Sequence, residues 1–161
     1  MKYTFFWKGP FSNWHPAEFT YKDHFFKNSE QAFMWEKAMT FEDHETANKI
    51  LKTESPKDAK DLGRLVKGYN DKIWEEVRYD YMFDVCMQKF LQNDKLKEKL
   101  LSCQNFVEAS PYDTIWGIGM GENEPGIENP KNWKGLNLLG QVLDEVRDSI
   151  ILYSKNEVNM Y

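Results

Sequence analysis

The sequence predicts an α+β fold: a predominantly helical single domain with a few short strands, covering residues 1–161. Three observations predict it. Capping residues and helical spacing of apolar side chains recur through residues 28–101 and 137–151. Residues 1–27 are instead rich in aromatics and interrupted by Gly9, Pro10 and Pro16, which favours short extended pieces. A chain of 161 residues also buries enough apolar surface for one compact domain without cross-links.

Capping residues set the expected helix bounds. Asn28 is the predicted N-cap of the first helix, and Gln31 completes a capping box. Pro56 after Ser55 opens the third helix, because proline is favoured at the first helical position. The expected helices cover about 28–39, 41–52, 56–65, 71–91, 93–101 and 137–151. The expected strands cover about 3–7, 19–22, 105–110 and 114–118; residues 119–135 are a loop, and 152–161 a frayed polar tail.

Composition and charge exclude several classes of protein. A net charge of -5 disfavours a protein that grips long nucleic acid through its phosphates. The two cysteines have no C-x-x-C spacing and the three histidines no metal-ligand spacing, so a reducing compartment and no metal are expected. No apolar run suits a signal peptide or a membrane span. We expect a cytoplasmic protein with no cofactor, no membrane association and no obligate protein partner.

The first helix carries two charges on an apolar stripe. Glu30 and Lys37 share this stripe with Phe33, Met34 and Phe41, while the opposite side of the helix is also apolar, which is typical of an interior helix. Seven residues separate the charges by about 10 Å along the axis, too far for a simple helical ion pair. If both side chains are buried, each needs a ligand or a partner from elsewhere in the protein. The structural alternatives are that both extend to the solvent at the edge of the buried stripe, or that each pairs with a residue of another helix.

These two side chains suggest covalent chemistry on a sugar. A desolvated Lys37 with a lowered pKa is able to attack the C1 of a sugar, giving a Schiff base once the ring opens. Glu30 lies in the first turn, where the helix dipole favours its ionised form, so it fits a base or an oxocarbenium stabiliser better than an acid.

Two arginines are candidate phosphate ligands. Arg78 lies in the middle of an apolar stripe of the long fourth helix, where a guanidinium normally pairs with a carboxylate or a phosphate. Arg64, beside Gly63, is a second cation for the same site. Pairing of Arg78 with an acid and simple surface exposure of Arg64 are the structural alternatives.

Residues 108–119 form a second candidate region. A strand, a proline turn and a second strand would bring Glu108 and Asp113 to one edge, and two carboxylates at a cleft suit glycosidic cleavage. Trp116 beside Gly117 offers a flat face for stacking a ring. The structural alternative is that Asp113 caps its own turn and Trp116 is part of the core.

The lead into the last helix is a candidate phosphate turn. Free backbone N–H groups at a helix start bind phosphate, and Lys134 would assist. Trp133 is a second candidate for stacking a base. Ordinary capping by Asn137 is the alternative, and no P-loop motif is present.

Taken in order, these residues resemble the NADAR (YbiA-like) domain family from about Phe5 to Arg147. The matching segments are Phe11-Ser12-Asn13, Glu30-Gln31-Ala32 with Lys37-Ala38, Leu62-Gly63-Arg64, Trp74 with Arg78, residues 108–111 with Asp113, residues 115–119, and Trp133-Lys134-Gly135 with residues 137–140. One departure is the lead before the first helix, residues 21–29, after which Phe33 must supply an aromatic. The loop at residues 120–132 is free to vary, which leaves the choice of substrate open.

The resemblance implies a mostly helical fold and hydrolysis of an N-glycosidic bond to a ribose that bears phosphate. Its two substrate branches are phosphoribosylamino-pyrimidine intermediates of riboflavin synthesis and ADP-ribose joined to guanine in nucleic acid. The resemblance also assigns attack on the anomeric carbon to Lys37 and places Asn13 in a family motif. We expect Lys37, Glu30 and Asp113 to be catalytic. The expected substrate-binding residues are Asn13, Arg64, Arg78, Glu108, Trp116, Gly117, Trp133, Lys134 and Asn137. The alternative is a non-catalytic module that binds ADP-ribose or NAD-derived nucleotides.

Overall fold

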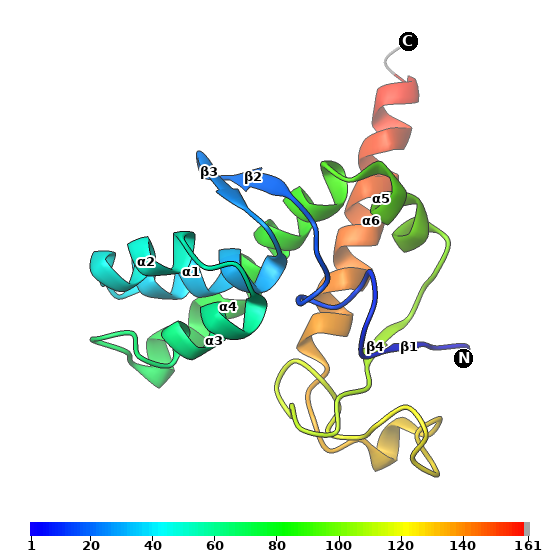
Figure 1. The fold of residues 1–161 in the computed structure, drawn as a ribbon. Coiled ribbons are helices and arrows are strands. Elements are labelled where there is room, and N and C mark those ends of the chain that lie inside the picture. The colour runs from blue at the N-terminus through cyan, green and yellow to red at the C-terminus, as the bar shows by residue number, and fades with distance from the viewer. Residues whose placement is uncertain (160–161) are drawn as a thin grey trace. The chain divides into compact units, whose positions relative to one another are not determined.

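The computed structural model describes the backbone of residues 1–159 and the side chains of residues 1–157 (Figure 1). Among these residues the chain forms six α-helices and four short strands. They gather into two compact units, one of residues 13–93 and one that joins residues 1–12 to the chain from Asp94 onward. No helix in the described part is long and apolar enough to cross a membrane.

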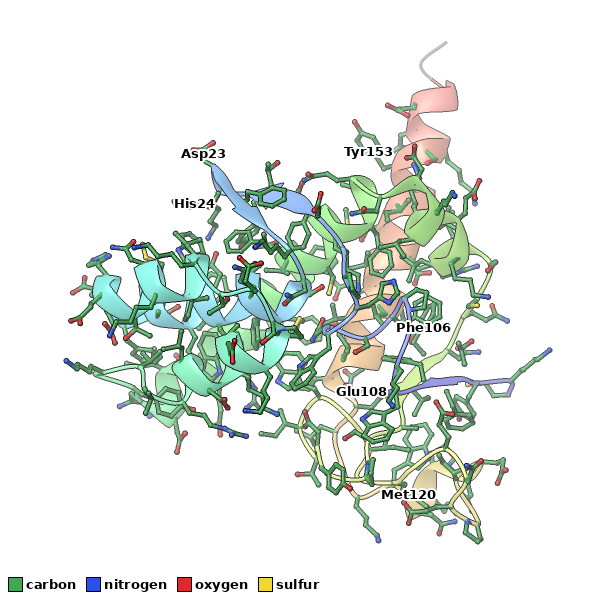
Figure 2. All side chains as sticks on the ribbon, viewed as in Figure 1. Asp23, His24, Phe106, Glu108, Met120 and Tyr153 are labelled. Atoms are coloured by element: carbon green, nitrogen blue, oxygen red, sulfur yellow. The ribbon has the colours of Figure 1, made fainter. Side chains whose placement is uncertain are left out.

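The unit of residues 13–93 is a helical cluster with one β-hairpin. Its elements are β2 (Phe19–Tyr21), β3 (His24–Phe26), α1 (Ser29–Thr40), α2 (His44–Leu51), α3 (Pro56–Gly63) and α4 (Asp71–Leu91). The strands pair antiparallel with Phe19 opposite Phe26, and Asp23 marks the tip of the hairpin in Figure 2. The sequence prediction contained β2 but not β3.

Helix α1 is the centre of this unit, as its two apolar sides predict. Nine of its 12 residues are buried, and it packs against α2, α3 and α4. Asn28 caps it, because its side chain accepts a hydrogen bond from Gln31 N at 2.8 Å. Gln31 Oε1 accepts from Lys27 N, one residue earlier than a capping box requires, and Gln31 Nε2 donates to Ile50 O. The amide therefore joins the start of α1 to the end of α2.

The other unit consists of β1 (Thr4–Phe6), α5 (Asp94–Leu101), β4 (Phe106–Glu108), the 3-10 turn η1 (Pro130–Asn132) and α6 (Leu138–Asn159). β1 and β4 pair in parallel, with Thr4 opposite Phe106. Helix α6 packs against β4 and α5. A second cluster of buried apolar residues is formed by β4 and the loop that follows it: Val107, Ala109, Ile118, Met120 and Ile127. Figure 2 marks Met120 in this loop.

Three predicted bounds differ from the structure. The second helix begins at His44 rather than Phe41, because Asp43 accepts from Thr46 N and caps it. Residues 114–118 form a bent, irregular segment rather than a strand, since their carbonyl groups accept hydrogen bonds from residues 134–139 instead of a neighbouring strand. Helix α6 continues through Asn159, whereas the sequence predicts its end near Ile151.

Candidate functional site

The residues predicted for the site divide between the two units. Asn13, Glu30, Lys37, Arg64 and Arg78 belong to the helical unit of residues 13–93. Glu108, Asp113, Trp116, Gly117, Trp133, Lys134 and Asn137 belong to the other unit. Each group has an arrangement of its own.

Lys37 lies in the last turn of α1 and is half-buried. Its Nζ is 4.6 Å from the centroid of the Tyr69 ring, a cation–π contact. Burial lowers the pKa of the Lys37 amine, and the positive charge of Arg64 lowers it further. The carboxylates of Glu30 and Asp71 act in the opposite direction. Because burial is the largest of these effects, more of the amine is neutral near pH 7 than in an exposed lysine.

Glu30 lies in the first turn of α1 and is 9% exposed. Its backbone N–H donates to the carbonyl oxygen of Asn13 at 3.1 Å, which fixes residue 13 beside the start of the helix. The Asn13 side chain is also buried and donates to the sulfur of Met82 at 3.5 Å. Its Oδ1 and the hydroxyl of Ser29 are buried and make no hydrogen bond within the described structure. Buried polar atoms in this condition are uncommon in proteins, and they are found at functional sites as well as beside buried waters.

The two arginines differ in exposure. Arg64 follows the end of α3, and its side chain is 67% exposed, with Asp61 3.7 Å away. A contact this long at the surface holds the guanidinium weakly, which leaves it free to meet a phosphate. Arg78 on α4 is half-buried rather than enclosed, and its charge acts on Tyr69. Arg78 therefore lies at the margin of the apolar stripe of α4 rather than within it.

Asp113 caps its own turn, which is the structural alternative considered for it. Its Oδ1 accepts from the N–H groups of Ile115 at 2.9 Å and Trp116 at 2.8 Å. Glu108 is half-buried at the end of β4, where Figure 2 marks it, and its carbonyl accepts from Ile118 N. A methyl group at Gly117 would lie 2.9 Å from that same carbonyl oxygen. The turn is thus closely packed, and its backbone positions the carboxylate of Asp113.

The predicted phosphate turn at the start of α6 has few free donors. The N–H groups of Lys134, Leu136, Asn137, Leu138 and Leu139 all donate to carbonyl oxygens of residues 114–118. The physical basis of the prediction, free backbone N–H groups, therefore does not hold for these five. The exposed side chain of Lys134 remains as a cation in this segment.

Trp133 and Asn137 have structural contacts. Trp133 Nε1 donates to Ile127 O at 2.7 Å, and the ring packs on the second apolar cluster and on Tyr3. Asn137 is buried with φ 54°, its Oδ1 accepts from Glu108 N, and its Nδ2 donates to Phe106 O, each at 3.0 Å. Its side chain therefore satisfies both the donor and the acceptor that β4 presents to α6.

Replacing Asn137 by alanine should lower the free energy of unfolding by about 2–3 kcal/mol, because two buried backbone groups of β4 lose their partners. Urea denaturation followed by tryptophan fluorescence measures it. If Asn137 acts only on substrate, the variant will unfold at the wild-type urea concentration and show a raised KM instead.

A family model described as the NADAR domain matches residues 5–151 of the chain. The chain belongs to the NADAR family. Protein irg-1 of Caenorhabditis elegans is 37% identical over 158 residues, covering 87% of this chain and 74% of that protein. N-glycosidase R617 of Acanthamoeba polyphaga mimivirus is 37% identical over 148 residues, covering 86% of this chain and 85% of that protein. The NMR structure of the E. coli protein YbiA matches with a TM-score of 0.76 at 26% identity, covering 94% of this chain and 86% of that one.

These similarities confirm the family resemblance and the predominantly helical α+β fold that the sequence predicts. One NADAR domain model spans residues from both compact units. The roles of individual residues stay predictions. In the described structure, no three His, Cys, Asp or Glu side chains are grouped as metal ligands.

Sequence reasoning missed Tyr69, which contacts the amine of the predicted nucleophile. Tyr69 lies in the connection between α3 and α4, where no helical period assigns it to a face. The local sequence signal is Gly68, a residue type common in turns, and its φ in the structure is 80°. Ser29 was missed for a different reason, since a serine next to an N-cap residue is ordinary at a helix start.

Proposed function

We propose that this NADAR chain hydrolyses the N-glycosidic bond between a (phospho)ribose or ADP-ribose and a base-like amine, with Lys37 as the nucleophile. Its class is that of relatives named N-glycosidases, hydrolases of N-glycosyl compounds. The observation that carries the assignment of Lys37 is its half-buried amine, whose pKa burial lowers, on a helix that is itself the centre of its unit. An amine is a nucleophile only when neutral, so this environment favours attack.

The proposed reaction has two steps. Neutral Lys37 Nζ forms a bond to C1 of the ribosyl group while the bond from C1 to the leaving nitrogen breaks, and that nitrogen takes up a proton. Loss of a proton from Nζ leaves a glycosylamine, and opening of the sugar ring converts it to a Schiff base. Water then adds to C1, and the bond to Nζ breaks. The sum is one water consumed, one free amine released and one ribosyl product with a hydroxyl group at C1.

The carboxylates have complementary roles in this proposal. Glu30, in the first turn of α1, is the carboxylate that would stabilise positive charge at the anomeric centre. Asp113 is the second proposed acid–base group, and the two N–H groups that donate to its Oδ1 fix its orientation. The proposed phosphate ligands are Arg64, Arg78 and Lys134. Trp116 and Trp133 are the proposed stacking surfaces, and Trp133 is held in place by its contacts with Tyr3 and Ile127.

The activity should rise with pH along a limb that reports Lys37. Since burial lowers the pKa of Lys37, the midpoint of this limb in kcat/KM should lie below the ordinary lysine value of 10.5. Replacing Arg64 by glutamine removes a positive charge that lowers this pKa, so the limb should move to higher pH. Initial rates from pH 5 to 11 measure both. A limb at or above 10.5 in the unmodified enzyme would contradict the assignment.

A substrate panel tests the proposed reaction. The protein is incubated with a phosphoribosylamino-pyrimidine, with an oligonucleotide carrying ADP-ribosylated guanine, and with ADP-ribose alone, and the products are separated by chromatography and weighed by mass spectrometry. We expect release of the free base from one of the first two, together with ribose phosphate or ADP-ribose. Tight binding of ADP-ribose with every glycosidic bond intact would favour the non-catalytic alternative.

A further inference from the structure

The amine of Lys37 contacts the face of an aromatic ring from the connection between α3 and α4. The Tyr69 ring centroid is 4.6 Å from Nζ, and Tyr69 is 43% exposed. A lysine side chain has four rotatable bonds and no fixed position of its own. A ring at cation–π distance restricts the positions that Nζ occupies.

The ring is itself held from two sides. Phe41, the residue that caps α1, packs edge-on against it with centroids 5.3 Å apart. The carboxylate of Asp71 at the start of α4 lies near the Tyr69 hydroxyl, and burial together with interaction with this carboxylate raises the pKa of Tyr69 to about 12. Tyr69 is therefore a neutral donor at physiological pH, and its ring orientation is set by contacts with α1 and α4.

The backbone that leads to Tyr69 is anchored to the end of α1 and the start of α2. Asp43 accepts from Thr46 N and the Thr46 hydroxyl as the cap of α2, and it also accepts from Lys67 N at 2.9 Å. These bonds lower the pKa of Asp43 to about 2. Gly68 follows with φ 80°, and the next residue is Tyr69. The carboxylate of Asp43 thus fixes the turn that presents the ring.

We propose that Tyr69 is a positioning residue: its anchored aromatic face seats the Lys37 amine at the point from which it reacts. The catalytic role of Lys37 rests on the proposed function, whereas the contact between Tyr69 and Lys37 is a property of the fold. The groups that face Lys37 are Glu30 from α1, Arg64 from the end of α3 and Asp71 from α4. Tyr69 stands among them as an uncharged group that favours the ammonium form, against the effect of burial.

Two substitutions separate the aromatic face from the hydroxyl. Tyr69→Leu keeps an apolar cover over Lys37 but removes the ring, so the pKa of Lys37 should fall and kcat should drop by roughly 10- to 100-fold, because the amine is less well placed. Tyr69→Phe keeps the ring and its contact with Phe41 and loses only the interaction with Asp71, so the pKa should stay close to wild type and kcat should fall much less than in Tyr69→Leu. Tyr153→Leu, an exposed tyrosine of α6, is the control for general effects.

The pKa is read from the 13Cε chemical shift of Lys37 in protein labelled with 13C-lysine, with the signal assigned from a Lys37→Arg sample. This measurement needs no turnover, so it tests the contact between the Tyr69 ring and the Lys37 amine even if Lys37 is not the nucleophile. An unchanged or raised pKa in Tyr69→Leu would overturn the proposal, and so would a lowered pKa with wild-type kcat. Loss of activity in Tyr69→Phe equal to that in Tyr69→Leu would overturn it as well, because the hydroxyl would then be the group that matters.

Discussion

Replacing Lys37 by alanine should lower kcat by about 10³-fold or more while the protein keeps its fold. The expected loss is large because the proposed covalent route disappears with the amine, and residual turnover would depend on the remaining charges alone. The fold should survive, since the side chain is half-buried rather than enclosed and its contact with Tyr69 is a single cation–π contact. Steady-state rates and the thermal midpoint of unfolding measure the two parts.

Lys60→Ala is the matched control for this prediction. Lys60 is an exposed lysine of α3 in the same unit, and its Nζ lies 5.9 Å from the centroid of the Trp14 ring. Its loss should leave kcat within a factor of about two to three, since surface changes of this kind have small effects. Near-normal kcat in Lys37→Ala would show that the nucleophile is a different group.

Replacing Gly140 by alanine should destabilise the protein by about 3 kcal/mol or more. A methyl carbon at this position of α6 would lie within 3.0 Å of the carbonyl oxygen of Phe106 and of both polar atoms of the Asn137 side chain. The Phe106 carbonyl belongs to β4 and cannot move independently, because it accepts from Asn137 Nδ2. Helix α6 must therefore shift away from β4, with loss of packing and of hydrogen bonds. Urea denaturation measures the change.

Gly121→Ala is the control for the effect of adding a methyl group to a glycine. Its methyl would meet only Glu124 Oε2, at 3.8 Å, which is ordinary van der Waals contact. The change in unfolding free energy should stay within about 0.5 kcal/mol. Equal stabilities of the two variants would mean that α6 and β4 are not packed as closely as the structure has them.

The helices could be predicted where the deciding interaction is local. Asn28 and Ser55 cap α1 and α3 by accepting from the residue three positions on, and both bonds involve neighbours in sequence. The start of α2 was misplaced because Phe41 continues the apolar spacing of α1, whereas the cap at Asp43 ends that pattern. The strand predicted at 114–118 failed for a non-local reason: its carbonyls are taken by residues 134–139.

The candidate site could be predicted where charge conflicts with burial. Glu30 and Lys37 were found because they share a stripe with apolar residues, and the structure does bury the first and half-bury the second. Tyr69 could not be found in this way, since its contact with Lys37 depends on a turn fixed by Asp43 and Lys67. The structural use of Asn137 was equally hidden, because its two partners lie on a strand about 30 positions earlier, 29 for Glu108 and 31 for Phe106.

The central claim is that Lys37 forms a covalent bond with the sugar, and borohydride trapping tests it most directly. Borohydride reduces a Schiff base to a stable amine, so the protein mixed with a cleaved substrate and borohydride should gain the mass of one reduced ribosyl group. Digestion and tandem mass spectrometry should place that mass on Lys37, and the Lys37→Ala variant should gain none. An adduct of equal yield in Lys37→Ala, or one that maps to a different lysine in the wild-type protein, would contradict the account.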